Sequence, residues 1–474
     1  MDLIHPRVTI YITNFNYARF IDKAIQSVIN QTYSNIELIV IDDGSTDNSK
    51  EVLAKYIRDE NINIVFQENK GLNRTNNIAL RMAQGEFIMR LDADDFLAPD
   101  AVEKMVTIFV DNPEMGLVFP DYYYVNLDNH VIGREIRHRF TDEVTLYDQP
   151  AHGACTLIRT EFLKHLGGYN EDYSCQDGYD LWLRFIALYK VGNINEPLFY
   201  YRIHPDSLSK NEKRILSTRR LIKASYVSKN FGEKKHRVFA IFPLRTLQIG
   251  EYSWPLEKVN GLPAYYFLIN DYLKSSTIDK LIVTTSSPDI IRTGKELFAG
   301  NHKVAFIYRR NDFEKMGVSL NPTINLIINH PDFDIKDTDI LVTCSPGYPF
   351  VGHQIIDEAV QNIQLFNADS VVSVRPDYAN YYKHSGGGLV PFLDQQKFSK
   401  YERDLIYKYA GGIMVTIVRY YKRNKSMLSG RISHVAINQL ESFHVETALD
   451  FEMFNVLKDT CEIYLSSNCC EFKI

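Results

Sequence analysis

The first two hundred residues alternate between short apolar segments and amphipathic segments, and this alternation limits the possible folds more than any other feature. Short apolar runs predict β-strands, whereas apolar residues spaced three and four apart predict helices. A repeated strand–helix–strand order favours a mainly parallel sheet with helices on its faces. The predicted strands are 8–13, 36–41, 62–66 and 87–91, and the predicted helices include 21–30 and 76–82.

Acidic residues follow two of these predicted strands. Asp42 and Asp43 end one strand, and Asp92, Asp94 and Asp95 end another. Parallel sheets bind ligands at the carboxyl ends of their strands, and carboxylates gathered there are costly to bury unless something neutralises them. A hard divalent cation shared with a substrate phosphate would do so, which favours a nucleotide-diphosphate ligand. The alternative is a solvated acidic turn.

The alternation restarts in the second half, with predicted strands at 237–242, 281–285, 340–343, 371–374 and 413–417. We therefore predict two α/β domains of the nucleotide-binding type, 1–234 and 235–474. Between them, residues 210–237 are rich in lysine and arginine. We expect a basic helix at about 210–230 that closes the first domain. It is either a solvated surface helix or a peripheral contact with an anionic membrane surface.

The overall composition excludes several classes of protein. The 474 residues are 45% hydrophobic and 24% charged, as in soluble globular proteins, and the net charge of −6 argues against nucleic acid as a partner. No apolar run approaches the length that spans a bilayer, and the first residues lack the layout of a signal peptide. The six cysteines show neither zinc spacing nor a disulfide framework. We expect a cytoplasmic protein, with peripheral contact at the inner face of the membrane as the variant that the basic helix allows.

At this point the first half resembles a known family. Residues 6–209 resemble a family 2 glycosyltransferase of the GT-A fold, with matches in the expected order. The matching segments are 12–16, 27–33, 40–47, 69–77, 91–95, 174–182 and 201–204.

The resemblance implies a reaction and assigns roles. It implies transfer of a sugar from a nucleotide-diphosphate donor to a glycan, lipid-linked or protein-linked acceptor, with inversion at the anomeric carbon. Asp94 would hold a divalent cation, Mn²⁺ or Mg²⁺, with His204 as a second ligand or a phosphate contact. Asp177 is the candidate general base for the acceptor hydroxyl. The predicted nucleotide-binding residues are Asn14, Asn16, Asp42, Asp43, Asp92 and Arg202, of which Asp92 could also reach the metal.

Four further residues have both a functional and a structural interpretation. His152 and Cys155 could line the acceptor pocket or serve the fold alone. Arg74 and Arg90 could reach phosphate, although placement at the surface is the default expectation for arginine.

The second half resembles the cytidylyltransferases that activate acidic sugars, over residues 237–457. The matches are structural: 260–263, 281–287, 368–374 and 447–451. The triphosphate-binding loop departs from the family pattern, because Arg245 and Gly250 are kept while Ile249 stands in place of the family lysine. His444 and Glu446 stand where the family has a metal-binding pair of aspartates.

The sequence therefore predicts a glycosyltransferase of surface polysaccharide assembly that carries a degenerate cytidylyltransferase-like domain. One alternative is a bifunctional enzyme whose second domain makes a CMP-activated acidic sugar. The other is a non-catalytic scaffold that binds nucleotide sugars.

Overall fold

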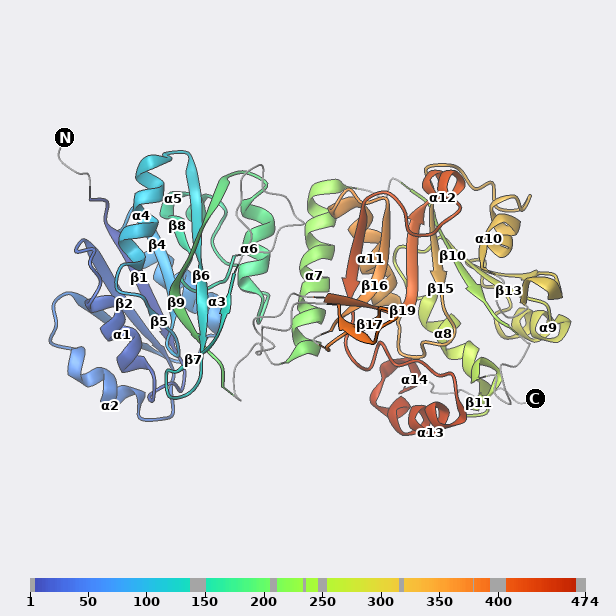
Figure 1. The fold of residues 1–474 in the computed structure, drawn as a ribbon, viewed down its shortest axis with the longest axis horizontal. Coiled ribbons are helices and arrows are strands. Elements are labelled where there is room, and N and C mark those ends of the chain that lie inside the picture. Colours follow the sequence, from blue (N-terminus) through green and yellow to red (C-terminus); the bar gives the residue numbers. More distant parts are fainter. Residues whose placement is uncertain are drawn as a thin grey trace. The chain divides into compact units, whose positions relative to one another are not determined.

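The computed structural model describes residues 5–136, 151–204, 211–232, 236–245, 254–314, 319–377, 379–392 and 406–465. The chain forms two compact units (Figure 1). The first unit comprises residues 1–219 and 378–404, and the second comprises 220–377 and 405–474. This division falls inside helix α7 (Glu212–Phe231), whereas the sequence placed the domain boundary after that helix, at 234/235.

The first unit is built on a mixed sheet with helices on both faces. Its elements are β1 (Val8–Asn14), α1 (Ile21–Ile29), β2 (Ile36–Asp43), α2 (Ser49–Leu53), β3 (Ile62–Gln67), α3 (Leu72–Met82), β4 (Phe87–Asp92), β5 (Phe96–Leu97), α4 (Ala101–Asp111), β6 (Met115–Val125), β7 (Val131–Glu135), β8 (Leu157–Arg159), α5 (Thr160–His165), α6 (Asp177–Phe185) and β9 (Lys190–Arg202). The strand order is β3-β2-β1-β4-β8-β6-β9-β5, with β7 beside β6. Strands β1 to β4 pair in parallel, and β8 runs antiparallel to its neighbours β4 and β6.

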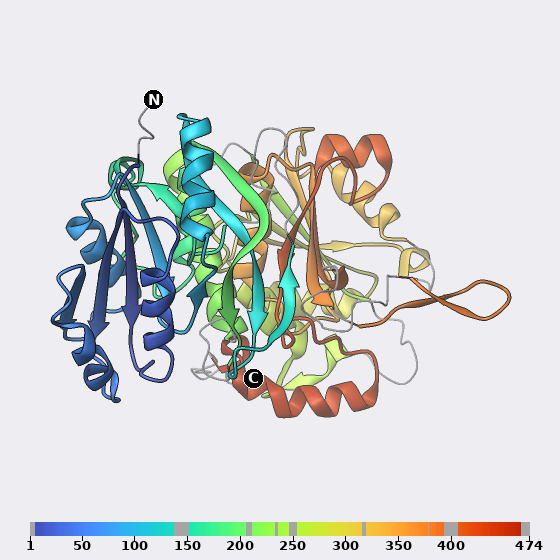
Figure 2. The same cartoon turned by 60° about the vertical axis from the view of Figure 1, so that its left-hand side comes forward.

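Alternate side chains of β1 enter two separate cores. Ile10 and Ile12 pack with residues of α1 and α4 on one face of the sheet. Tyr11 packs with residues of α3, α5 and α6 on the other face. Successive side chains of a strand point to opposite faces, so a strand covered on both sides reads as a continuous apolar run. These layers can be followed in Figures 1 and 2.

The first unit confirms the predicted strands at 8–13, 36–41, 62–66 and 87–91. Helix α3 begins earlier than predicted, at Leu72 instead of residue 76. Its first turns bury polar side chains, since Asn73 and Asn76 are buried and Asn73 Nδ2 donates hydrogen bonds to the carbonyl oxygens of Asn170 and Tyr173. Because the buried face of these turns is polar, the apolar residues show no helical spacing there, and the start of this helix could not be predicted from the sequence.

The second unit also has a mixed sheet covered on both faces. Its main elements are β10 (Val238–Pro243), β11 (Lys258–Val259), β12 (Leu262–Pro263), α8 (Ala264–Tyr272), β13 (Lys280–Thr285), α9 (Pro288–Leu297), β14 (Val304–Tyr308), α10 (Asn321–Ile328), β15 (Ile340–Cys344), α11 (His353–Leu365), β16 (Ser370–Asp377), β19 (Ile406–Ile417), α12 (Val418–Asn424), β20 (Ile432–Ala436), α13 (Ala448–Leu457) and α14 (Glu462–Leu465). The strand order is β14-β13-β10-β15-β19-β16-β20. A short hairpin, β17 (Tyr382–His384) and β18 (Leu389–Pro391), lies in the segment grouped with the first unit.

The two sheets share one topology. In the first unit, three parallel strands are followed by β4, the antiparallel β8, and the parallel pair β6 and β9. In the second unit, β15, the antiparallel β19, and the parallel pair β16 and β20 follow in the same way. The order of these strands along the chain also corresponds. The sequences of the two halves gave no such indication, because strand order depends on packing and not on local residue patterns.

Helix α7 is neither a solvated helix nor a simple basic stripe. Within the first unit, the Arg219 guanidinium donates to the Gln176 side chain at 2.6 Å and lies 5.2 Å from the centre of the Tyr179 ring. Within the second unit, Arg220 pairs with Glu358 at 3.0 Å and with Glu441 at 2.9 Å. Lys223, which is 8% exposed, also pairs with Glu358. Much of the positive charge of this helix is therefore neutralised inside the protein.

Candidate active site

The carboxyl ends of β1 and β2 bring the first predicted residues together. Asn14 lies opposite Asp42 in the parallel register, and its Nδ2 donates to Asp42 Oδ2 at 2.7 Å. The same Nδ2 donates to Ser45 Oγ at 3.1 Å. The two side chains are 1% and 0% exposed, so the pair is part of a preformed floor at this edge of the sheet.

Asp43 and Asn16 hold the loops that border this floor. The Asp43 carboxylate accepts hydrogen bonds from the backbone amides of Lys70 and Gly71, at 2.8 and 2.9 Å. Gly71 has a positive φ of 84°, a conformation that favours glycine at the residue before α3. Asn16 Oδ1 accepts from the Thr46 amide at 2.7 Å. These contacts fix the loops in place, and the nucleotide-binding roles of both residues stay predictions.

The turn after β4 meets the end of β9. Asp94 Oδ2 lies 2.9 Å from His204 Nε2, and His204 is 4% exposed. Asp95 is 1% exposed, and its Oδ1 accepts the backbone amide of Arg202 at 2.8 Å. Burial, followed by the charges of Asp94 and Asp92, holds the pKa of Asp95 well above its usual range. Two segments 110 residues apart in sequence thus form one acidic turn with a histidine against it.

Arg202 stabilises that turn through hydrogen bonds of its guanidinium group. Its Nε donates to the Asp94 carbonyl oxygen at 2.7 Å, its Nη1 to the Asn126 carbonyl oxygen at 2.8 Å, and its Nη2 to Asn129 Oδ1 at 2.7 Å. The guanidinium also lies 4.5 Å from the centre of the Phe20 ring. The side chain is 1% exposed, so these contacts make it an internal clamp on the backbone of the acidic turn.

Arg90 joins the turn after β4 to the start of α6, and its placement corrects the expectation of an arginine at the surface. It lies in β4 with a side chain only 5% exposed. Its Nε lies 2.9 Å from Asp92 Oδ1, and its Nη1 donates to Asp177 Oδ2. The sequence offered Arg90 as a phosphate contact or a surface residue but not its two carboxylate partners, because an arginine inside an apolar run gives no local sign of them. Burial raises the pKa of Asp92 to about 6, although the charge of Arg90 acts in the opposite direction.

The donor set at the acidic turn fits a divalent cation that is shared with a substrate. Within the described residues, no group of three or more histidine, cysteine or acidic side chains is gathered as a complete metal cage. Asp94 and His204 nevertheless offer one carboxylate and one imidazole side by side. Mg²⁺ in nucleotide sites commonly takes one or two protein ligands and completes its shell with phosphates and water. The pair is therefore suitable for a cation that arrives with its nucleotide.

His152 and Cys155 lie beside this centre. Cys155 is fully buried, burial raises the pKa of its thiol, and its backbone amide donates to the Arg90 carbonyl oxygen at 2.8 Å. The His152 ring lies among aromatic rings, 5.4 Å from Tyr122 and 4.9 Å from Tyr201. Cys155 thus packs the sheet, while His152 belongs to an aromatic wall next to the acidic centre. Arg74 pairs at the surface with Glu171, at 3.4 Å.

The residues predicted for a site in the second unit are not brought together as those of the first unit are. Arg245 follows β10, and Gly250 lies outside the described residues. His444 Nδ1 is 3.7 Å from Glu446 Oε2, and the His444 ring stacks on Tyr348 at 4.5 Å. Among the described residues, no hydrogen bond or ion pair joins Arg245 to either of them. The cytidylyltransferase resemblance is therefore left without an assembled site.

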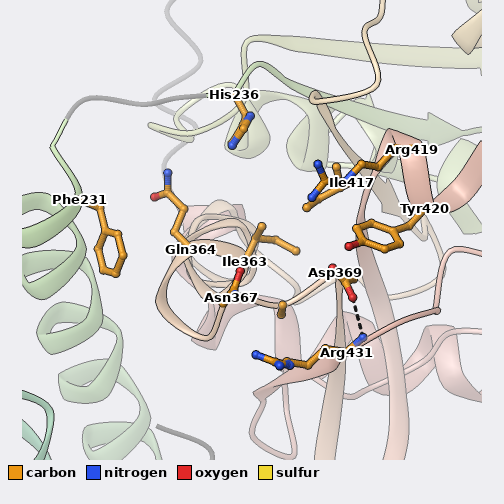
Figure 3. Close-up of a pocket in the computed structure, with 11 residues that line it drawn as sticks. Phe231, His236, Ile363, Gln364, Asn367, Asp369, Ile417, Arg419, Tyr420 and Arg431 are labelled. Atoms are coloured by element: carbon orange, nitrogen blue, oxygen red, sulfur yellow. Dashed lines mark hydrogen bonds between the residues drawn. The ribbon is translucent and has the colours of Figure 1, made fainter. Parts of the chain in front are cut away.

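A pocket of about 460 Å³ lies elsewhere in the second unit (Figure 3). His236, Asp369 and Arg431 line it; Asp369 and Arg431 directly precede β16 and β20, and His236 lies two residues before β10. The pocket is therefore at the amino-terminal edge of the sheet, opposite the edge where parallel sheets bind nucleotides. None of the residues predicted for nucleotide binding lines it.

No helix in the described ranges is both long enough and apolar enough to cross a membrane.

Comparisons with known proteins bear on the first unit. A family model described as Glycosyl transferase family 2 matches residues 9–167. An uncharacterized glycosyltransferase of Haemophilus influenzae is 30% identical over 219 residues, which are 43% of this chain and 68% of that protein. Chondroitin synthase of Escherichia coli is 26% identical over 263 residues, which are 54% of this chain and 37% of that protein.

Among solved structures, the crystal structure of S. aureus TarS 1–349 in complex with UDP aligns with a TM-score of 0.38 and 19% identity. The alignment covers 47% of this chain and 65% of that one.

Proposed function

Since this chain belongs to family 2 of the glycosyl transferases and is a glycosyltransferase, we propose that it is a metal-dependent, inverting enzyme that uses a nucleotide-diphosphate sugar. One observation carries the proposal: Arg90 links Asp92 of the turn after β4 to Asp177 of a distant segment, and His204 contacts Asp94 of the same turn. Relatives named as chondroitin synthase favour a glycan or lipid-linked acceptor in surface polysaccharide assembly. The chain spans only about a third of that synthase, so the acceptor belongs to the proposal.

The donor would bind along the carboxyl edge of β1, β2 and β4. Asp42 and Asn14 form a buried, preformed pair whose oxygens are suited to accept from a base or ribose, and among the described residues Asn14 Oδ1 has no hydrogen-bond partner. Asp94 and His204 would hold the cation, and a bound Mn²⁺ or Mg²⁺ would neutralise the diphosphate leaving group. Arg202 keeps the backbone of this turn in place for that task.

Asp177 would activate the acceptor. Its Oδ2 is engaged by Arg90, so Oδ1 is the oxygen that would take the proton from the acceptor hydroxyl. Attack by that hydroxyl on the anomeric carbon, from the side opposite the leaving diphosphate, inverts the configuration.

The test is a comparison of the full-length protein with Asp177→Asn. We first identify the donor by calorimetric binding of UDP, GDP, dTDP and CDP, with and without Mn²⁺. Asp177→Asn should then bind the same nucleotide with a dissociation constant within about 3-fold of wild type. Its kcat should fall by about 10²–10⁴-fold, the usual contribution of general-base catalysis. Wild-type turnover by Asp177→Asn would remove this residue as the base.

We infer that the second unit is a cytidylyltransferase-like domain that has lost its activity. Its sheet shares the topology of the glycosyltransferase unit, which supports descent from a nucleotide-binding fold. The lysine expected in the triphosphate loop is replaced by Ile249, and without that charge a triphosphate is held less tightly. Release of pyrophosphate from CTP and an acidic sugar by the full-length protein would instead establish the bifunctional alternative.

Peripheral contact of α7 with an anionic membrane surface is a separate proposal. It rests on the exposed Lys213 and Lys229, because four other basic residues of this helix have partners within the protein. Cosedimentation with vesicles that contain anionic lipid tests it.

A further inference from the structure

We propose that Arg90 is a positioning residue that holds the general-base candidate Asp177 against the acidic turn, and that Gly153 is required because it leaves room for the Arg90 guanidinium. This inference rests on the proposed function, since it concerns the same site. Neither residue touches the donor or acceptor in the proposed mechanism, so both act through Asp177 and Asp92.

The charge arrangement supports this role. Arg90 and Asp177 have side chains only 5% and 9% exposed. A buried charge is costly unless it is paired, and here one guanidinium faces two carboxylates. Different nitrogens make the two contacts: Nε faces Asp92 and Nη1 faces Asp177. The planar fork of arginine allows this double contact, whereas a lysine ammonium is a single point charge on a flexible stem.

The space around the guanidinium is limited by Gly153. A Cβ atom at residue 153 would lie 2.5 Å from Arg90 Nη2 and 3.2 Å from Cζ. The guanidinium cannot simply move aside, because it is held by carboxylates on both sides. The φ of Gly153 is not in the left-handed region, so space and not backbone conformation requires glycine here.

The position of Arg90 in the sheet explains why its ion pair with Asp177 would matter for turnover. Arg90 lies in β4, which is locked in parallel register to β1, with Tyr11 opposite Arg90. Asp177 is the first residue of α6, a short helix that follows Gln176 in a left-handed conformation. The ion pair thus fixes a residue at a helix end to the centre of the sheet. Displacement of a reacting group by about 1 Å can cost about 10²-fold in rate.

The test measures kcat, donor KM and nucleotide affinity for Arg90→Lys, Gly153→Ala and the double variant. We expect kcat to fall by about 10- to 100-fold in each single variant, while the dissociation constant of the nucleotide changes by less than about 3-fold. The double variant should lose little more than Arg90→Lys alone, because both changes break the same contact. Gly192→Ala is the matched control, since its Cβ would meet only the flexible end of Met115, and it should keep wild-type kcat.

The outcomes separate this inference from the proposed function. If Asp177→Asn is inactive while Arg90→Lys and Gly153→Ala turn over normally, the positioning role is wrong and the base assignment stands. Losses that multiply in the double variant would also overturn it. If Asp177→Asn is fully active, the proposed function itself fails.

A stability measurement tests the ion pair without any donor. Arg90→Gln leaves the buried Asp177 and the partly exposed Asp92 without their cation, and Asp177→Asn removes one of these two carboxylates. The double variant Arg90→Gln/Asp177→Asn should therefore melt at least ~3 °C above Arg90→Gln alone. Equal or lower melting of the double variant would show that no such pair exists. If Arg90→Gln does not fold, recovery of folded protein in the double variant gives the same answer.

Discussion

At the scale of single residues, the site is a balance of buried charge. Arg90 and Arg202 bring two positive charges against Asp92, Asp94, Asp95 and Asp177. Arg202 directs its guanidinium at backbone and amide oxygens and so serves the shape of the turn. Asp94 faces His204 at 2.9 Å and is the carboxylate proposed to meet a cation.

Arg202→Lys tests the clamp on this turn. A lysine keeps the charge but cannot supply the three directed donors, so buried carbonyl groups would lose partners. We expect the first unit to lose about 2–4 kcal/mol of stability and Mn²⁺-dependent nucleotide affinity to fall by about 10-fold or more. Urea unfolding and calorimetry measure the two effects. Arg58→Lys, at an exposed position, is the matched control and should leave both unchanged.

The sequence identified the acidic residues of the site but not all of its organisation. Strand ends pointed to Asp42 and Asp94, where acidic residues follow apolar runs, whereas Asp177 was predicted from the resemblance of segment 174–182 to the family. The sequence offered Arg90 only as a phosphate contact or a surface residue, and it did not reveal its carboxylate partners or the space that Gly153 leaves for it. Their roles depend on contacts between segments far apart in the chain, and no local period records such contacts.

At the scale of elements, the spacing of apolar residues predicted the central part of each strand but not the residues by which some strands extend beyond it. The structure confirms the predicted strand at 413–417, but β19 begins at Ile406. Its first residues, Tyr407 to Tyr409, are exposed and polar or aromatic, so they carry no buried-strand pattern. They are held in the sheet by pairing with β16. Pairing partners, unlike periods, cannot be read from one segment alone.

Helix α11 offers a prediction at this scale, because its start is capped from another helix. Asp271 of α8 accepts the His353 amide at 2.8 Å and lies 3.1 Å from His353 Nδ1. Burial raises the pKa of Asp271, but the hydrogen bonds from His353 outweigh burial and hold that pKa below its ordinary value. Asp271→Ala should cost the second unit about 1–2 kcal/mol at pH 7.

The pH dependence of this cap follows from the lowered pKa. A lowered pKa adds stability above the pKa of the unfolded chain, and that stability is lost as the pH falls through the folded value. The gap between wild type and Asp271→Asn should therefore shrink below about pH 4. The chain has two tryptophans, so a Trp182→Phe background leaves Trp254 as the fluorescent reporter of the second unit. A gap that widens on acidification would contradict the cap.

At the scale of the whole molecule, the two units share a strand order but differ in the residues at the carboxyl ends of their strands. In the first unit, β2 and β4 end in Asp43 and Asp92. The corresponding strands of the second unit, β13 and β15, end in Thr285 and Cys344. Hydroxyl and thiol groups are poor substitutes for carboxylates toward a hard cation. The strand order is thus shared, but of these four strand ends only the two in the first unit carry carboxylates.

This difference predicts the behaviour of Asp94→Ala in the full-length protein. If the first unit holds the cation, the variant should lose Mn²⁺-dependent nucleotide binding altogether, with affinity reduced by at least about 10²-fold. Its melting temperature should change little, because Asp94 is partly exposed and its contact with His204 is opposed by repulsion from Asp92 and Asp95. Calorimetry should show about one metal-dependent nucleotide site in wild type and none in the variant. A metal-dependent site that survives Asp94→Ala would contradict the assignment of Asp94, and a preference of that site for CTP would reopen the bifunctional alternative.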